Sequence, residues 1–174
     1  MILTVTAICL GVSPLPGKDP VVRAAIGEHG LEGDRHATQT VRVRAGRRRG
    51  EVIFNERQWS AVGEEELVDL GRATGVLLPV GSLGENFRFS GLPDLSRLPF
   101  GTRLRFPSGA VLLVSGQNFP CQKQADYLAD LLGAPALRRG FIPAARERRG
   151  LVGWVEQTGT AAPGDVVAVE PPSA

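Results

Sequence analysis

Short apolar runs, each cut off by glycine, proline or charge, constrain the fold of this chain more than any other feature. The runs ILTVTAICLGV (2–12), ENFRFSG (85–91) and VVAVE (166–170) are alternating or rich in β-branched residues, as strands are. The 22 glycines and 13 prolines among 174 residues favour many short elements joined by turns. We therefore expect a mainly β fold, a single domain over residues 1–174 built as a closed or partly closed barrel with a few peripheral helices.

Two segments carry helical patterns instead. The first predicted helix begins after Asn55, has Gln58 as its capping-box partner and ends at Gly71. The second covers residues 121–133, where an apolar stripe runs from the first residue to a closing glycine. The segment 137–150 is harder to assign, and we expect it to hold a short helical turn.

Charge and hydropathy argue against a nucleic-acid-binding, a secreted and a membrane protein. A net charge of +2 is too small to indicate a nucleic-acid partner, although residues 42–50 form the basic run RVRAGRRRG. This run is either the solvated tip of a hairpin or an electropositive rim that attracts an anionic ligand. The N-terminal segment lacks a basic n-region, and no apolar stretch nears the ~20 residues that cross a bilayer, so we expect no signal peptide and no membrane insertion.

Cysteine occurs only twice, at Cys9 and Cys121, which is too few for a disulfide framework and indicates a reducing, cytoplasmic location. Cys9 lies within an apolar strand and is expected to be inert core. Cys121 lies where a strand passes into a helix, so the helix dipole and Lys123 would favour a thiolate that acts as nucleophile, sulfur acceptor or soft metal ligand. It also shares a stripe with Ala125 and Leu128, which leaves open that it is buried packing.

Two glycine-containing loops supply the other candidates. GLEGDRHA brings together Asp34, Arg35 and His36, where Arg35 either binds a phosphate or carboxylate bidentately or bridges to a neighbouring loop. GSLGENF places Glu85 and Asn86 behind two glycines, which suits recognition of a heterocycle or an anion. Serine-hydrolase, P-loop and dinucleotide motifs are absent, and two histidines without a CxxC pair argue against a structural zinc site.

The order of these motifs resembles the MOSC domain, which is named after the C-terminal domain of molybdenum cofactor sulfurases. The matching stretches are GLEGDRHA, GSLGENFRFSGL, a strand that ends in PC, and GLVGWVEQTGTAAPGDVV. The resemblance implies a β-barrel in which a single cysteine is the functional residue, and Cys121 is the position that matches it. It further implies that this cysteine carries sulfur as a persulfide or ligates the molybdenum of a pterin cofactor.

We therefore expect a stand-alone MOSC protein that handles sulfur or binds the molybdenum cofactor (molybdopterin) through Cys121. Its partner would be that small-molecule cofactor or a sulfur donor or acceptor protein, and its oligomeric state stays open. The expected cofactor-binding residues are Asp34, Arg35, His36, Glu85, Asn86 and Lys123.

Several activities remain open at this point. The protein could be a sulfur transferase or a molybdenum-dependent oxidoreductase that reduces N-hydroxylated bases. The alternative from another class is a non-catalytic binding module with a buried cysteine, whose basic run meets an acidic partner. The resemblance does not extend to the pyridoxal-phosphate domain of full sulfurases, and we expect no such lysine site.

Overall fold

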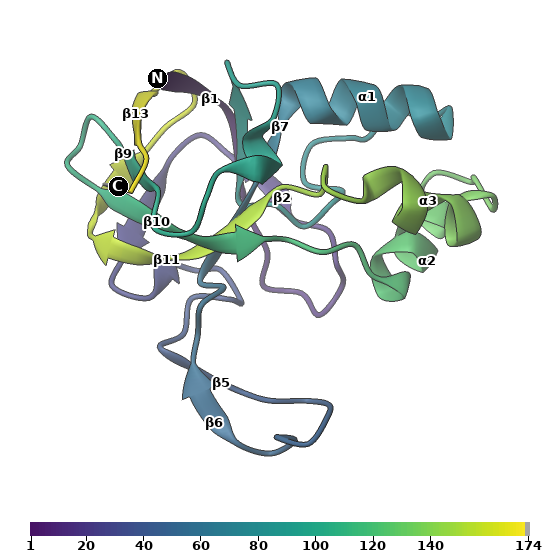
Figure 1. Ribbon diagram of the computed structural model, residues 1–174, viewed down its shortest axis with the longest axis horizontal. Coiled ribbons are helices and arrows are strands. Elements are labelled where there is room, and N and C mark those ends of the chain that lie inside the picture. The colour runs from purple at the N-terminus through teal and green to yellow at the C-terminus, as the bar shows by residue number, and fades with distance from the viewer. Residues whose placement is uncertain (173–174) are drawn as a thin grey trace.

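The computed structural model describes residues 1–172 and shows a closed β-barrel flanked by helices (Figure 1). The barrel strands are β1 (Ile2–Leu10), β7 (Trp59–Gly63), β8 (Phe87–Ser90), β9 (Arg103–Arg105), β10 (Val111–Gln117), β11 (Leu151–Gln157) and β13 (Val166–Glu170). Their order is β13-β9-β10-β11-β7-β8-β1, and the pairing of β1 with β13 closes the ring of seven strands. The mainly β class and the barrel architecture are thus confirmed.

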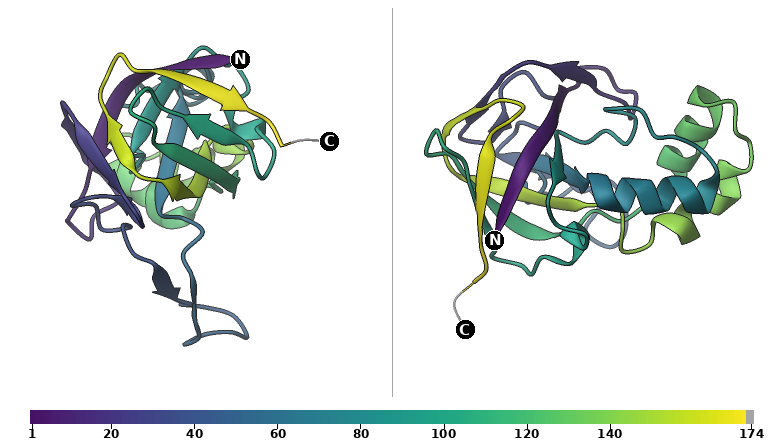
Figure 2. Two further views of the ribbon diagram at one scale, coloured as in Figure 1. Left: turned by 90° about the vertical axis from the view of Figure 1, so that its left-hand side faces the viewer. Right: turned by 90° about the horizontal axis from the view of Figure 1, so that it is seen from above.

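Smaller strands extend this barrel. They are β2 (Asp19–Val21), β3 (Ala24–Gly27), β4 (Gly30–Leu31), β5 (Thr40–Arg42), β6 (Val52–Phe54) and β12 (Gly159–Ala161). β2 pairs with β1, while β12, β3 and β4 form a separate three-stranded sheet. β5 and β6 form a two-stranded hairpin that projects away from the barrel (Figures 1 and 2).

The helices gather on one side of the barrel (Figure 2). They are α1 (Glu64–Thr74), α2 (Gln122–Leu131) and α3 (Leu137–Ala145), with a 3-10 turn at Leu95–Arg97. α2 confirms the second predicted helix, and α3 is a helix of nine residues where we expected only a turn. No helix within the described part of the chain is long and apolar enough to cross a membrane.

The first predicted helix is wrong over its first half. Residues 59–63 form the strand β7, which pairs antiparallel with β11 and parallel with β8, and α1 begins only at Glu64. The expected capping residues serve other contacts, since the Oε1 atom of Gln58 accepts a hydrogen bond from the Val155 N–H at 3.0 Å. Asn55 instead fixes the base of the β5–β6 hairpin. Pairing with two neighbouring strands therefore overrides the local helical pattern.

The end of α1 also differs from the prediction. The helix continues past Gly71 to Thr74 and stops at Gly75, whose φ of 72° is the left-handed conformation of a helix C-cap. The Gly75 N–H donates to the Gly71 carbonyl at 2.8 Å, so the predicted stop residue accepts the capping bond one turn earlier. Glycine at the left-handed position is the residue that ends the helix.

Two apolar clusters hold the fold together. In the barrel, β13 buries Val167 and Val169 between exposed neighbours, whereas β10 buries four consecutive residues. Phe87 and Phe89 of β8 stack there with their ring centroids 5.6 Å apart. A second cluster packs the three helices together and includes Leu128 of α2. The connection from β10 to α2 therefore passes from one cluster to the other.

Candidate functional site

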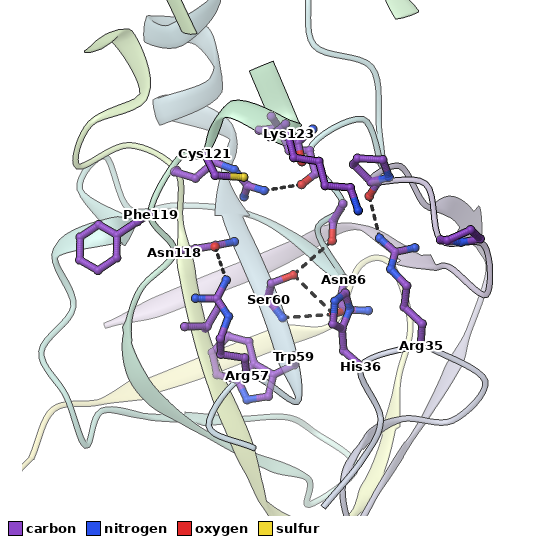
Figure 3. A pocket seen from close by; sticks show the side chains of 17 residues that line it. Arg35, His36, Arg57, Trp59, Ser60, Asn86, Asn118, Phe119, Cys121 and Lys123 are labelled. Carbon is purple, nitrogen blue, oxygen red and sulfur yellow. Dashed lines mark hydrogen bonds between the residues drawn. The ribbon is translucent and has the colours of Figure 1, made fainter. Parts of the chain in front are cut away.

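A pocket of about 210 Å³ opens where β10 connects to α2 (Figure 3). Cys121 lines this pocket as the N-cap residue of α2, and its side chain is exposed. Its extended backbone, with φ −137° and ψ 162°, separates it from the buried stripe of α2 that holds Ala125 and Leu128. The interpretation of Cys121 as buried packing is therefore wrong.

Hydrogen bonds hold the segment that leads to this cysteine. The Asn118 N–H donates to the Gly150 carbonyl at 2.9 Å, and the Oδ1 atom of Asn118 accepts a bond from Arg57 Nη2 at 2.7 Å. Phe119 follows with 72% of its surface exposed. The thiol thus sits on a fixed connection at the open edge of the pocket, where a reaction partner can reach it.

The pocket wall is strongly basic. Its cationic side chains are Arg35, Arg57, Lys123 and Arg149, and His36 lies beside them. None of the described residues that line it is an aspartate or a glutamate. Such a wall attracts anions and disfavours cationic ligands.

Arg149 is the most deeply buried of these cations, with 7% of its surface exposed. Its Nη2 atom donates to the Leu83 carbonyl, but Nε and Nη1 have no hydrogen-bond partner within residues 1–172. Burial lowers the pKa of Arg149 to about 10, and the charges of Glu85 and of a Cys121 thiolate oppose that shift. The side chain is still protonated at neutral pH, so a buried cation with unused donors lies in the pocket wall. A buried charge of this kind requires a partner, which an anionic ligand would supply.

Asp34 lies behind the pocket wall as the centre of a buried network. Its Oδ2 atom lies 2.8 Å from Lys18 Nζ and accepts bonds from the Gly11 N–H at 3.0 Å and from Asn86 Nδ2 at 3.1 Å. Burial alone would raise the pKa of Asp34, but hydrogen bonds from His36 and the attraction of Lys18 lower it well below its usual range. Burial in turn lowers the pKa of Lys18 to about 8. Asp34 therefore orients the loop residues of the pocket from behind.

Glu85 and Arg35 hold backbone loops in place. Glu85 is fully buried, and its carboxylate accepts bonds from the Gly81 N–H at 2.8 Å and from Arg88 Nε at 2.7 Å. Arg35 lines the pocket, but its Nη2 atom already donates to the Pro16 carbonyl at 2.7 Å. Its Nη1 atom donates to the Ser13 carbonyl at 3.0 Å, so both Nη atoms of Arg35 are used within the protein and the side chain bridges to a neighbouring loop.

The structure brings most of the predicted site residues together. Those that line the pocket are Arg35, His36, Asn86, Cys121 and Lys123. Asp34 and Glu85 are not part of the wall and support it through the contacts described above. The two glycine-containing loops and the start of α2 therefore meet at one site.

Sequence reasoning missed several residues of the wall. The polar and aromatic ones are Arg57, Trp59, Ser60, Asn118, Phe119, Gln124 and Arg149. Arg57 and its neighbours fell within the segment that was assigned to a helix. Arg149 is the last arginine of RERR (146–149), which has the pattern of a solvated charge cluster. The glycine and the apolar strand that follow it were the only signal that set it apart.

The donor set bears on metal binding. No group of three or more His, Cys, Asp and Glu side chains that could hold a metal ion occurs in the described residues. Cys121 is the soft donor of the pocket wall. A metal bound there would need most of its ligands from a cofactor of its own.

Comparison with known proteins identifies relatives of the chain. The profile of the MOSC domain matches residues 30–168. YuaD of Bacillus subtilis, a protein named for a proposed part in metal-sulfur cluster biosynthesis, is 39% identical over an alignment of 148 residues, and the match covers 80% of this chain and 76% of that protein. The crystal structure of YuaD superposes with a TM-score of 0.92 at 32% identity, over 99% of this chain and 98% of the other.

Two structures of YiiM share the fold at lower identity. The protein from Geobacillus stearothermophilus has a TM-score of 0.68 and 20% identity, over 97% of this chain and 75% of its own. The one from Escherichia coli has a TM-score of 0.66 and 18% identity, over 100% of this chain and 72% of its own. These two comparisons bear on the fold alone, whereas the profile match covers both glycine-containing loops and Cys121. The chain belongs to the MOSC domain family.

Proposed function

We propose that this protein accepts and carries sulfur as a persulfide on Cys121. The observation that supports the proposal is an exposed cysteine at the N-terminus of a helix, in a pocket wall that holds cations and, among residues 1–172, no carboxylate. A thiolate or persulfide is an anion, and both the helix dipole and these cations stabilise anions. The name of the relative YuaD, which refers to metal-sulfur cluster biosynthesis, is in line with a role in sulfur handling.

The proposed reaction is a thiol–disulfide type of exchange. The thiolate of Cys121 attacks the outer sulfur of a persulfide donor, so a sulfur–sulfur bond forms on Cys121. The sulfur–sulfur bond of the donor breaks, and the donor leaves as a thiolate. Electrons balance without an added oxidant or reductant. Arg149 and Lys123 would stabilise the negative charge on the transferred sulfur.

The size of the pocket favours this small group. A volume of about 210 Å³ is below the roughly 300–1,000 Å³ of sites that enclose a drug-sized ligand. A persulfide sulfur fits within it, whereas a pterin cofactor would extend beyond it.

One observation favours the molybdenum cofactor as a second candidate. The unused N–H groups of Arg149 fit a phosphate, and Cys121 is a soft ligand suited to molybdenum. In that case Arg149 and Lys123 would hold the phosphate and Cys121 the metal. When bound, the cofactor would supply the redox chemistry needed to reduce N-hydroxylated bases.

Mass spectrometry distinguishes the two candidates. The purified protein is incubated with glutathione persulfide, alkylated and digested, and we expect one added sulfur on the peptide that contains Cys121. Cys121→Ser should lose this sulfur, whereas Cys9→Ser should keep it. Elemental analysis of protein from a cofactor-producing host tests for molybdenum. Sulfur loading that persists in Cys121→Ser would refute the proposal.

A further inference from the structure

The β5–β6 hairpin, which we call the arm and define as residues 40–54, stands apart from the rest of the molecule. Figures 1 and 2 show it projecting from the barrel beyond all other segments. All but two of its side chains are exposed, including the apolar ones of Val41, Val52 and Phe54. A hairpin of two three-residue strands buries little surface and adds little to the stability of the barrel.

The arm accounts for the net positive charge of the protein. It holds five arginines and one glutamate, while the chain has 20 Lys and Arg against 18 Asp and Glu, so the remainder has 15 against 17. Arg48 pairs with Glu51 at 2.7 Å. The side chains of Arg44, Arg47 and Arg49 make no hydrogen bond or ion pair with any described residue. These three guanidinium groups are available to a partner.

An aromatic patch adjoins the base of the arm. Phe54 of β6 packs edge-on against Trp154 of β11 with ring centroids 5.7 Å apart, and Phe100 lies against the same ring at 6.0 Å. Phe54 and Phe100 remain 48% and 64% exposed. Exposed aromatic residues that pack together next to arginines have the composition of a protein–protein interface.

The base of the arm is joined to the pocket that contains Cys121. The Nδ2 atom of Asn55 donates to the carbonyls of His36 at 2.9 Å and Thr38 at 3.0 Å, so it ties the two ends of the arm together. His36 before the arm and Arg57 after it both line the pocket. A partner held by the arm is therefore guided to the site of the thiol.

We propose that the arm and the aromatic patch form a docking surface for an acidic protein that exchanges sulfur with Cys121. The inference rests on the proposed function and specifies the partner by its charge. The three unpaired arginines complement carboxylates, and the patch supplies the apolar anchor. A nucleic acid fits less well, because the remainder of the protein has more acidic than basic residues and would repel a phosphate backbone.

Persulfide peptides of matched design test the charge complementarity. One peptide is rich in glutamate, and the second has glutamine in place of each glutamate with the same apolar residues and a single cysteine persulfide. At low ionic strength we expect the acidic peptide to load Cys121 about tenfold faster, as electrostatic steering does. High salt should reduce that advantage.

A triple variant, Arg44→Gln with Arg47→Gln and Arg49→Gln, should abolish the preference for the acidic peptide. The fold is expected to be unaffected because these side chains are exposed and unpaired. Loading by glutathione persulfide should also stay unchanged.

The matched control changes three exposed arginines of the helical side, Arg139, Arg146 and Arg148, to glutamine. This control should keep the preference for the acidic peptide. Equal loading by both peptides, or a preference that survives in the arm variant, would overturn the docking surface and leave the sulfur-carrier function in place.

A binding assay that involves no sulfur transfer tests the docking surface separately from the sulfur-carrier function. Fluorescence anisotropy with labelled peptides that lack the cysteine measures docking even if no persulfide ever loads Cys121. We expect the acidic peptide to bind more tightly than its glutamine counterpart, and Phe100→Ala to weaken it severalfold. Tighter binding of a single-stranded DNA oligonucleotide than of the acidic peptide would overturn the assignment of the partner as a protein.

Discussion

Replacement of Arg149 by methionine should remove an anion-binding group at little cost to stability. Burial lowers the pKa of Arg149 from 12.5 to about 10, which at ~1.4 kcal/mol per unit amounts to about 3 kcal/mol of unfavourable free energy for the charged form. Methionine is apolar and avoids that penalty. It also loses the bond to the Leu83 carbonyl, which for a charged donor contributes about 1.5–3 kcal/mol. The free energy of unfolding of the variant is therefore expected to equal that of the wild-type protein or to exceed it by up to about 2 kcal/mol.

Urea unfolding with and without inorganic phosphate measures both effects. In the wild-type protein, phosphate at ten times its dissociation constant should raise the free energy of unfolding by about 1.4 kcal/mol. Arg149→Met should show no such increase, whereas Arg139→Met, on the exposed surface of α3, should keep it. A loss of more than about 2 kcal/mol in Arg149→Met without phosphate, or an unchanged response to phosphate, would refute the reasoning that Arg149 is a binding residue.

Iodoacetamide at neutral pH should alkylate the exposed Cys121 in the folded protein and the buried Cys9 only after unfolding, and equal rates by peptide mass spectrometry would contradict this. Asp34→Asn should lower the free energy of unfolding in urea by about 3–5 kcal/mol because it leaves Lys18 buried without its partner; a loss below about 1 kcal/mol would show that the pair is dispensable. Burial raises the pKa of Cys9 from 9.0 to about 12. Between these values the unfolded chain binds fewer protons, so the free energy of unfolding should fall as pH rises, and Cys9→Ala should reduce that slope.

The strands that the sequence predicts well are those whose burial alternates along the chain. β13 is an example, because its period of two is visible in VVAVE and is realised by inward-facing valines. β7 could not be predicted in this way, since residues 59–63 are a strand only by virtue of pairing with β11, about 90 residues later, and with β8. The same apolar residues also fit a helical period, so local pattern alone could not decide.

Some residues of the candidate site could likewise be predicted from the local sequence, and others could not. Cys121 was predictable as the start of a helix because a proline precedes it and an apolar stripe follows. Arg149 was not, because an arginine in a basic run is normally solvated, and it becomes buried here only where the Leu83 carbonyl from a distant loop reaches it. Glu85 was expected in the pocket because it follows two glycines in a loop, but the N–H groups of that same loop bind its carboxylate.

Closure of the barrel by β1 and β13 has a consequence for synthesis of the protein. The contacts between Thr4 and Val166 join the first strand of the domain to its last, so the two segments leave the ribosome far apart in time. Until β13 emerges, the nascent chain exposes one edge of β1 and one edge of β9, and unpaired edges of this kind favour aggregation. The ring can therefore close only after nearly the whole domain has been translated, and chaperones that shield strand edges would act on it during that interval.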